Sequence, residues 1–216
     1  GKKILITAGP TYERIDPVRF IGNFSSGKMG FSLAEECAQR GAEVLLIAGP
    51  TALKTMHPRI GRIDVESAQQ MHDAAVSAFP RMDAAILSAV VADYRPLRSR
   101  PEKMKREGQE EFSLTLTTNP DIAASLGQMK EAHQALIGFA LETNDELLNA
   151  RKKLERKNLD FIVLNSLQDE GAGFGGDTNK VTILSREGNK TSFGLKSKKE
   201  VAKDIVDIVF HVGPSH

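Results

Sequence analysis

The sequence has little of what marks secreted, membrane-spanning or nucleic-acid-binding proteins. One cysteine among 216 residues excludes an internal disulfide and argues against the class of small secreted proteins that disulfides stabilise. The longest apolar stretch, Ala84 to Ala92, is far shorter than the roughly 18 residues that a membrane helix needs. Lysine and arginine number 29 against 28 aspartates and glutamates, and this balance argues against a binder of nucleic-acid backbones. We therefore expect a cytoplasmic protein with neither membrane nor nucleic-acid partners.

The beginning of the chain lacks the basic and apolar segments of a signal peptide, so none is expected. Strand-like sequence starts directly after Gly1, so we expect either a domain cut from a longer protein or a first residue left by an expression tag. Hydrophobic residues make up 40% and charged residues 26%, the mixture of an ordinary globular protein. Because no linker or internal repeat interrupts the chain, we expect a single domain over residues 1–216.

Short apolar segments that end at turns alternate with amphipathic segments. Lys3–Ala8 predicts a buried strand, Ser26–Arg40 a helix with one apolar stripe, and Glu43–Ala48 a second strand, which together form a βαβ unit with parallel strands. Further helices are expected at 67–79, 121–129, 145–157 and 201–212, and further strands at 84–89, 135–140 and 161–164. This alternation predicts a doubly wound, Rossmann-like α/β fold with a mostly parallel sheet.

Three segments do not fit the alternation. Residues 94–110 are charged and contain two prolines, which predicts a long mobile loop. Residues 112–117 alternate apolar and polar side chains, as a half-exposed strand does, and residues 180–194 resemble a hairpin. Antiparallel strands of this kind need partners, so we expect a small antiparallel extension made of residues 111–117 and 180–194.

The segment Gly22–Lys28 has the spacing of a phosphate-binding P-loop but does not satisfy the whole motif. Met29 stands where a P-loop needs serine or threonine, and a long loop separates the segment from the first strand. A looser hypothesis is that Ser25, Ser26 and Gly27 open a helix whose free N–H groups favour an anion. The alternative is that these residues only cap and pack the helix.

Other features favour ordinary structural roles. The glycine-rich segment Gly171–Gly176 is interpreted as a flexible loop, because no helix follows it. Lys153 and Lys157 are neighbours on one helix face, which forms either an anion site or, more commonly, a solvated surface. The five histidines show no metal spacing and no nucleophile beside them, so neither a zinc site nor a catalytic triad is expected. Cys37 lies on an apolar stripe and is expected in the core.

Six sequence motifs follow one another along most of the chain. They are ITAGPTYERIDPVRFIGNFSSGKMG at 6–30, VADYRP at 91–96, PEKMK at 101–105, NPDI at 119–122, GFALETN at 138–144 and KNLD at 157–160. With these motifs the chain resembles the phosphopantothenoylcysteine synthetase domain of bacterial bifunctional coenzyme A biosynthesis flavoproteins. The first motif is long and very specific, and the resemblance outweighs the local alternatives above.

The resemblance implies a phosphopantothenate–cysteine ligase. Such an enzyme joins 4′-phosphopantothenate to L-cysteine and cleaves CTP to CMP and pyrophosphate, through an acyl-cytidylate intermediate. Magnesium is the implied cofactor, held mainly by phosphate oxygens and water, so no protein ligand is assigned to it. Family members outside bacteria use ATP, and the bacterial character of the motifs favours CTP here.

The resemblance also implies partners. The family is dimeric, so we expect a homodimer in which the hairpin at 180–194, alone or together with 112–117, pairs across a two-fold axis. The flavin-containing decarboxylase half is missing from this chain, so no FMN site is expected, and native fusion to such a phosphopantothenoylcysteine decarboxylase domain remains open.

The resemblance also implies roles for individual residues that match the family's motifs. Lys103 is the implied catalytic lysine, which would act on the phosphates or the anhydride, and Asn23 is the implied asparagine that holds the acyl intermediate during amine attack. The nucleotide-binding residues implied by the resemblance, with the helix start and the strand ends added, are Gly9, Ser25, Ser26, Gly27, Leu87, Ser88, Ala89, Asp93, Pro120, Asp121, Ile122, Ala123, Phe139, Lys153 and Lys157.

Three alternatives stay open at this point. One is the same ligation with ATP in place of CTP. Another is an NAD(P)-dependent oxidoreductase on the same fold, although the chain shows neither a GxGxxG loop after its first strand nor the YxxxK pair common in such enzymes. The third is a nucleotide-binding module without catalytic activity, in which Lys103 and Asn23 could be replaced without chemical consequence.

Overall fold

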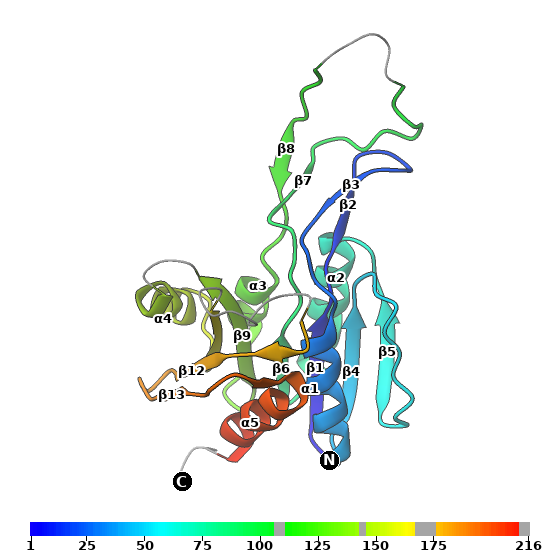
Figure 1. Cartoon of the computed structure of the whole chain (residues 1–216). Helices are drawn as coiled ribbons and strands as arrows, with labels where there is room; N and C mark the ends of the chain where they lie inside the picture. Colours follow the sequence, from blue (N-terminus) through cyan, green and yellow to red (C-terminus); the bar gives the residue numbers. More distant parts are fainter. Residues whose placement is uncertain (106–110, 143–145, 167–175, 212–216) are drawn as a thin grey trace.

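A computed structural model describes residues 1–105, 111–142, 146–166 and 176–211. Its centre is a sheet of eight strands in the order β13-β12-β10-β9-β6-β1-β4-β5 (Figure 1). The parallel strands are β1 (Lys3–Ala8), β4 (Glu43–Ala48), β5 (Ile60–Asp64), β6 (Ala84–Leu87), β9 (Ala135–Glu142) and β10 (Phe161–Ser166). Because β1 pairs with both β4 and β6, the chain winds outward from β1 to one edge and then from β6 toward the other. The predicted Rossmann-like α/β fold is confirmed.

Helices cover both faces of this sheet. On one face lie α1 (Lys28–Gln39) and α5 (Lys198–His211), and on the other lie α2 (Ala68–Ala78), α3 (Ile122–Met129) and α4 (Glu146–Arg156). A single 3-10 turn, η1 (Phe79–Arg81), follows α2. Among the described helices, none has the length and apolar character to cross a bilayer.

Two apolar cores, one on each face, explain why β1 reads as a continuous hydrophobic run. Ile4 and Ile6 point into the core beneath α1 and α5, whereas Leu5 points into the core beneath α2 and α3. All three side chains are at most 2% exposed. In a strand that is buried on both faces, every side chain can be apolar, so the sequence does not alternate between apolar and polar residues. Cys37 is 1% exposed on α1, so its expected place in the core is confirmed.

The predicted hairpin at 180–194 exists but lies in the central sheet. Its strands are β12 (Val181–Ser185) and β13 (Lys190–Ser192), and β12 pairs with β10 in antiparallel orientation. Since β12 has β10 on one side and β13 on the other, it offers no free edge to a second molecule. A second copy could therefore pair with this hairpin only along the free edge of β13, and pairing of the hairpin across a two-fold axis stays a prediction. A small pair, β11 (Thr178–Asn179) and β14 (Lys196–Ser197), precedes α5.

Two antiparallel ribbons extend beyond the sheet, at the top of Figure 1. One joins β2 (Tyr12–Arg14) to β3 (Phe20–Gly22), and the other joins β7 (Tyr94–Pro96) to β8 (Leu116–Thr118). The expected loop at 94–110 therefore begins with a strand, and the expected strand at 112–117 is found only from Leu116 on. Hydrogen bonding to β7 and to the residue after it decides this extent: Thr115 O still accepts from the N–H of Leu97 at 2.9 Å, and residues 112–114 have no partner strand in the described part of the chain.

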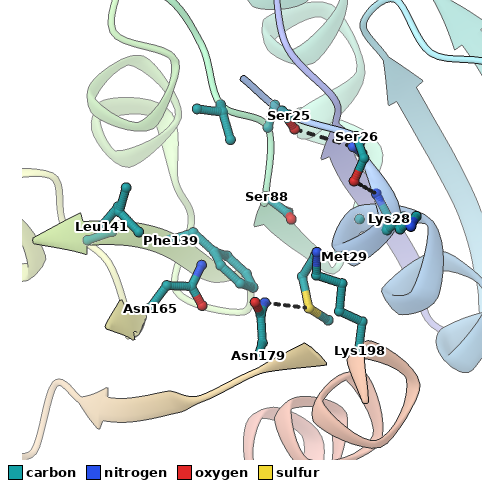
Figure 2. A pocket seen from close by; sticks show the side chains of 15 residues that line it. Ser25, Ser26, Lys28, Met29, Ser88, Phe139, Leu141, Asn165, Asn179 and Lys198 are labelled. Atoms are coloured by element: carbon teal, nitrogen blue, oxygen red, sulfur yellow. Dashed lines mark hydrogen bonds between the residues drawn. The ribbon is translucent and has the colours of Figure 1, made fainter. Parts of the chain in front are cut away.

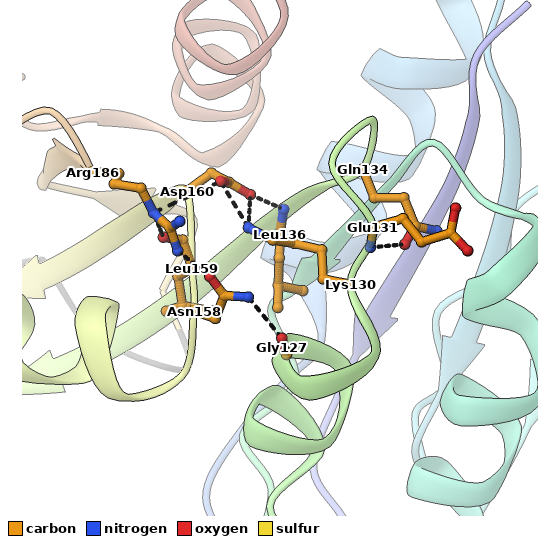
Figure 3. A network of polar contacts seen from close by, with 9 residues as sticks. All are labelled: Gly127, Lys130, Glu131, Gln134, Leu136, Asn158, Leu159, Asp160 and Arg186. Atoms are coloured by element: carbon orange, nitrogen blue, oxygen red, sulfur yellow. Dashed lines mark hydrogen bonds and ion pairs between the residues drawn. The ribbon is translucent and has the colours of Figure 1, made fainter.

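Asp160 fastens the start of β10 to its surroundings (Figure 3). Both carboxylate oxygens accept from Lys130 Nζ at 2.8 Å, and Oδ2 also accepts from the backbone N–H of Leu136 at 2.7 Å. Lys130 follows α3 and Leu136 lies on β9, so one carboxylate joins three elements. These contacts hold in place the turn between α4 and β10, which includes the predicted nucleotide-binding residue Lys157.

Candidate nucleotide-binding site

The order of the strands reverses between β1 and β6, and the segments that follow these two strands lie together. The backbone N–H of Val90 donates to Gly9 O at 2.9 Å, and that of Ala89 donates to Thr7 Oγ1 at 3.3 Å. Crevices at such switch points are where open α/β sheets bind ligands. Gly9 has φ of 82° and packs closely against Gly27, since a Cβ on Gly27 would be 3.4 Å from Gly9 Cα.

Helix α1 begins at this crevice without a side-chain cap. Its N-cap is Gly27, with φ of 79°, and no side chain accepts a hydrogen bond in the capping position. The hydroxyls of Ser25 and Ser26 instead accept from the N–H groups of Gly27 and Lys28 at 3.3 and 3.4 Å. Both bonds are long, so the start of a twelve-residue helix retains N–H groups that an anion can approach. The structure makes Gly27 rather than Ser26 the N-cap, and an anion-binding role for Ser25–Gly27 stays a prediction.

A small cavity of about 130 Å³ opens at the start of α1 (Figure 2). It contains the predicted residues Ser25, Ser26, Gly27, Ser88, Ala89 and Phe139. It also contains Asn165, Asn179 and Lys198, which the sequence did not single out. The Oδ1 atom of Asn165 is buried and has no hydrogen-bond partner among the described residues, whereas Asn179 Nδ2 lies 3.6 Å from Met29 Sδ.

Two lysines give this small cavity a positive wall. Lys198 is 6% exposed and donates to Gly176 O at 2.6 Å, and Lys28 forms an ion pair with Asp177 at 2.6 Å. Burial lowers the pKa of Lys198, and the neighbouring charge of Lys28 lowers this pKa further while Asp177 opposes the change. An anion in the cavity would favour the charged form of Lys198.

A large cavity of about 690 Å³ lies beside the small one, and Ala89 and Phe139 line both. It brings together segments from the end of β6, the base of β7, the start of α3, β9 and the end of α4. The predicted nucleotide-binding residues that line it are Leu87, Ala89, Asp93, Pro120, Asp121, Ile122, Ala123, Phe139, Lys153 and Lys157. Residues that were not predicted but also line it include Tyr94, Asn119 and Arg156.

Lys157 is held toward this large cavity by an ion pair. Its Nζ lies 2.9 Å from Asp121 Oδ2, and Asp121 caps α3 by accepting from the N–H of Ala124 at 3.0 Å. Burial would raise the pKa of Asp121, but these hydrogen bonds and the charges of Lys157 and Arg156 outweigh burial and lower it. The carboxylate therefore stays ionised at neutral pH, and Lys157 keeps a partner that phosphate oxygens could replace.

The turn after Lys157 is fixed by its own contacts (Figure 3). Asn158 has a left-handed backbone with φ of 53°, and its Nδ2 donates to Gly127 O at 2.8 Å. Gly127 is needed because a Cβ there would lie 2.0 Å from Lys157 O. Arg186 of the β12–β13 turn donates to Leu159 O at 3.1 Å. Thus α3 lies against the backbone of the lysine that enters the cavity.

Asn119 joins the two loops at the mouth of the large cavity. Its Nδ2 donates to Ala92 O at 2.8 Å, its backbone N–H donates to Asp93 O at 2.8 Å, and its Oδ1 accepts from Arg95 at 3.1 Å. The segments VADYRP and NPDI are thereby held side by side. The Asp93 side chain is exposed, so it can reach a ligand that lies in the mouth.

Neither predicted catalytic residue lines either cavity as the described residues define them. Asn23 directly follows β3, and its Nδ2 donates to the backbone O of Val91 at 3.1 Å, so it is tied to a residue of the large cavity's wall. Lys103 is exposed in the segment that follows β7. The structure therefore brings Asn23 to the rim of the site and leaves Lys103 outside it.

The histidine prediction needs a correction. His72 Nε2 lies 2.9 Å from Ser125 Oγ, and His72 Nδ1 lies 3.2 Å from Asp73 Oδ1, so one histidine does stand beside a hydroxyl. These residues line neither cavity, and their bonds join α2 to α3. The arrangement is a structural contact that the sequence could not reveal, because the pair is far apart in the chain. Among the described residues, no group of three histidine, cysteine or acidic side chains could hold a metal.

Comparison with known proteins identifies relatives over nearly the whole chain. The family model described as "DNA/pantothenate metabolism flavoprotein C-terminal domain" matches residues 1–212. The coenzyme A biosynthesis bifunctional protein CoaBC of Vibrio vulnificus is 45% identical over 206 residues, which are 95% of this chain and 51% of that protein. A protein named cysteine/cysteine sulfinic acid decarboxylase, from an unknown prokaryotic organism, is 54% identical over 206 residues, 95% of this chain and 57% of that protein. The chain thus spans about half the length of the curated relatives it matches.

Solved structures share the fold. The crystal structure of the C-terminal domain of a CoaBC protein superposes with a TM-score of 0.81 at 43% identity, and covers 96% of this chain and 93% of that one. The DNA/pantothenate metabolism flavoprotein from Streptococcus pneumoniae superposes with a TM-score of 0.85 at 24% identity, over 99% and 100% of the two chains. The second likeness concerns the fold alone.

Proposed function

Because the chain belongs to the family of DNA/pantothenate metabolism flavoprotein C-terminal domains, we propose that it ligates 4′-phosphopantothenate to L-cysteine in coenzyme A biosynthesis. The observation that carries the proposal is the large cavity, where motif residues from separate parts of the chain meet at the sheet's switch point. The similarity to CoaBC proteins supports the same reaction class.

In the proposed reaction, CTP occupies the large cavity. A carboxylate oxygen of 4′-phosphopantothenate attacks the α-phosphorus, the bond to the β-phosphate breaks, and pyrophosphate leaves. The cysteine amine then attacks the acyl carbon of the acyl-cytidylate, loses a proton, and expels CMP. Activation is needed because a free carboxylate is a poor acceptor for an amine, whereas CMP is a good leaving group.

Different residues that line the cavities suit the phosphates and the base of CTP. Lys153, Arg156 and Lys157 supply positive charge for the phosphates. The turn 120–123 presents backbone N–H and C=O groups at the start of α3. These groups can form hydrogen bonds with the cytosine base, and such bonds would leave no recognisable side-chain pattern in the sequence. Because Ala89 and Phe139 line both cavities, the phosphates can extend from the large cavity to the N-terminus of α1, where Ser25–Gly27 meet them.

Asn23 and Lys103 are the proposed catalytic residues. The Asn23 amide is already joined to the cavity wall and can bind the acyl group during amine attack. Lys103 lies outside the cavity in this structure, so its segment and the β2–β3 turn to which that segment is bonded must approach the phosphates together for its charge to stabilise the transition state. Loop closure over a bound substrate is a common way to complete such a site.

Magnesium fits the proposed site as an ion that enters with the nucleotide. The carboxylates in the lining of the large cavity are those of Asp93 and Asp121, and Asp121 is already paired with Lys157. Few carboxylates suit an ion that is held mainly by phosphate oxygens and water. When bound, magnesium would neutralise triphosphate charge. We assign it no protein ligand and propose no FMN site in this chain.

The cellular context is part of the same proposal. The CoaBC relatives are bifunctional proteins of which this chain matches about half, so we propose native fusion to a decarboxylase domain. The one thiol is free and buried, which agrees with a cytoplasmic location. We also propose a homodimer, in which the two ribbons contact the second copy through exposed apolar side chains such as Val18 and Leu97.

One assay tests the reaction. Purified protein is incubated with 4′-phosphopantothenate, L-cysteine and magnesium, and pyrophosphate release is measured with CTP and with ATP, each against omission of one substrate. Release that requires all components and prefers CTP supports the proposal. NADPH oxidation would instead favour a reductase, carbon dioxide release from cysteine would favour a decarboxylase, and nucleotide binding without any product would favour a non-catalytic module.

A further inference from the structure

A fully buried carboxylate lies in the turn of an otherwise exposed ribbon. Asp16 stands between β2 and β3, and its side chain is 0% exposed, whereas the neighbouring Val18 is 60% exposed. An ionised group is costly to bury unless it is paired and hydrogen-bonded. The contacts of Asp16 therefore indicate what this position requires.

The two oxygens of Asp16 make different kinds of contact. Oδ1 accepts from the backbone N–H groups of Val18 and Arg19, both at 2.8 Å, and so closes the turn within the hairpin. Oδ2 accepts from the Arg19 guanidinium, at 3.0 Å from Nε and 2.6 Å from Nη2, and from the backbone N–H of Met104 at 3.1 Å. Only the second oxygen reaches a segment that is distant in the sequence.

Further hydrogen bonds join the same two segments. Arg19 Nη2 donates to Met104 O at 2.8 Å, and the backbone N–H of Arg100 donates to Ile15 O at 2.9 Å. The segment that precedes and follows Lys103 is thus attached to the β2–β3 turn at both of its ends. β3 leads directly from this turn to Asn23.

We propose that Asp16 is a positioning residue for Lys103, because it attaches the backbone beside that lysine to the hairpin whose second strand carries Asn23. This inference rests on the proposed function, in which both residues act on one intermediate. Asp16 itself touches neither substrate nor cavity, and acts through the Met104 amide.

The charge of Asp16 is maintained at working pH. Burial would raise its pKa, but hydrogen bonds from the N–H groups of Val18, Met104 and Arg19 and from the Arg19 side chain outweigh burial and hold the pKa well below its ordinary value. A carboxyl group with a lowered pKa keeps its contacts above the pKa of the unfolded chain and loses them as the pH falls through the folded value. The attachment is therefore present throughout the neutral range.

The test uses Asp16→Asn in the full chain. If the amide oxygen takes the place of Oδ1, the hairpin turn keeps its acceptor, while the amide nitrogen faces donors that Oδ2 formerly satisfied. Since a displacement of about 1 Å in a catalytic group can cost about a hundredfold, we expect kcat to fall between about tenfold and a hundredfold. The KM for CTP should change less than about twofold, because the large cavity is untouched. Asp64→Asn, which removes another aspartate paired with an arginine, is the matched control.

A double-mutant cycle separates positioning from general stability. If Asp16 acts through Lys103, Asp16→Asn should add little to the loss caused by Lys103→Gln, whereas independent effects would multiply and overturn the proposal. Asp16→Ser, which also provides a short acceptor for the turn, repeats the cycle if the asparagine variant does not fold.

Hydrogen exchange at the Met104 amide supplies a readout that does not depend on activity. Faster exchange at this amide in Asp16→Asn, with unchanged exchange in the central sheet, supports the attachment, and unchanged exchange at Met104 overturns it. If the wild-type chain released no pyrophosphate, the proposed function would fail, while this exchange measurement would still decide whether the attachment exists.

Discussion

Asn23 and Lys103 occupy different environments, and this difference predicts different defects. Asn23 is joined to the cavity wall through Val91, so it is placed to act on a bound intermediate, whereas Lys103 carries a charge suited to the phosphates. We expect Lys103→Gln to slow formation of the acyl-cytidylate by about a hundredfold or more, which is typical when one transition-state donor is removed. Asn23→Asp should spare that step and slow the reaction with cysteine.

Rapid quench of the reaction with labelled CTP measures the two steps separately. In the absence of cysteine, Asn23→Asp should still accumulate the acyl-cytidylate and Lys103→Gln should not. Lys152→Gln, which changes an exposed lysine outside both cavities, provides the matched control. Equal accumulation in the two variants would contradict the division of roles.

Cys37 allows a second prediction at the residue scale. Burial raises the pKa of its thiol to about 12, with a smaller contribution in the same direction from Glu36. The thiolate, which is the reactive form, is therefore scarce near pH 8, and the sulfur is also shielded from reagents. We expect one thiol per chain to react with 5,5′-dithiobis(2-nitrobenzoic acid) in denaturant and almost none in the native protein. Rapid native reaction would show that α1 opens readily from the sheet.

Some residues of the site could be predicted from the sequence, and others could not. Residues in recognisable motifs, such as Asp93 and Phe139, were predicted to bind a nucleotide and do line the large cavity. Asn165, Asn179 and Lys198 were not found, because each comes from a segment whose local pattern is ordinary. Lys198, in particular, belongs to a lysine-rich run that is typical of a solvated surface, whereas the fold buries it in the wall of the small cavity.

At the scale of elements, the contact between α3 and the turn after α4 offers a test of how packing supports the site. A methyl group on Gly127 would lie 2.0 Å from the backbone oxygen of Lys157. This clash cannot be relieved by a side-chain rotation, so the backbone itself would have to shift. We expect Gly127→Ala to lower the free energy of unfolding by roughly 1 to 3 kcal/mol, the usual cost of overpacking, and to weaken CTP binding by displacing Lys157. Urea unfolding and calorimetric titration measure the two effects.

Gly194→Ala is a suitable control for this variant, because a Cβ at position 194 meets no atom within 4 Å. It should leave both stability and CTP affinity nearly unchanged. Loss of stability in Gly127→Ala with normal CTP affinity would show that the backbone adjusts without moving Lys157, and would remove the proposed link between this packing contact and the cavity.

Elements with a strong pattern were predictable, and short exposed ones were not. The long apolar runs and periodic helices gave nearly correct positions, as β1 and β4 show. β5 was missed because it is an edge strand whose residues are all partly exposed, so it has no apolar run. β2 and β3 were missed because three-residue strands in a polar loop depend on pairing with each other, which local sequence does not encode.

For the molecule as a whole, the two ribbons raise the question of what covers their apolar side chains. Val18, Tyr94, Leu97 and Leu116 are between 43% and 60% exposed, and β2 lies beside β7, so these ribbons form adjoining surfaces. Two-stranded ribbons are only marginally stable in water, and exposed apolar clusters mark interaction sites. A second copy related by a two-fold axis would present the same apolar residues in return, which is the usual geometry of a homodimer.

Light scattering on the double variant Val18→Glu, Leu97→Glu tests this arrangement. We expect the wild-type chain to have a mass of about 47 kDa, twice the 23.6 kDa of one chain, and the variant to approach the single-chain value. Both side chains are more than half exposed within one chain, so the monomer should still fold, which circular dichroism can verify. Met56→Glu changes an apolar side chain that is 92% exposed outside the ribbons, and it should leave the dimer intact. A wild-type monomer at micromolar concentration would contradict the homodimer, and a variant that remains dimeric would place the interface elsewhere, with the free edge of β13 as the next surface to examine.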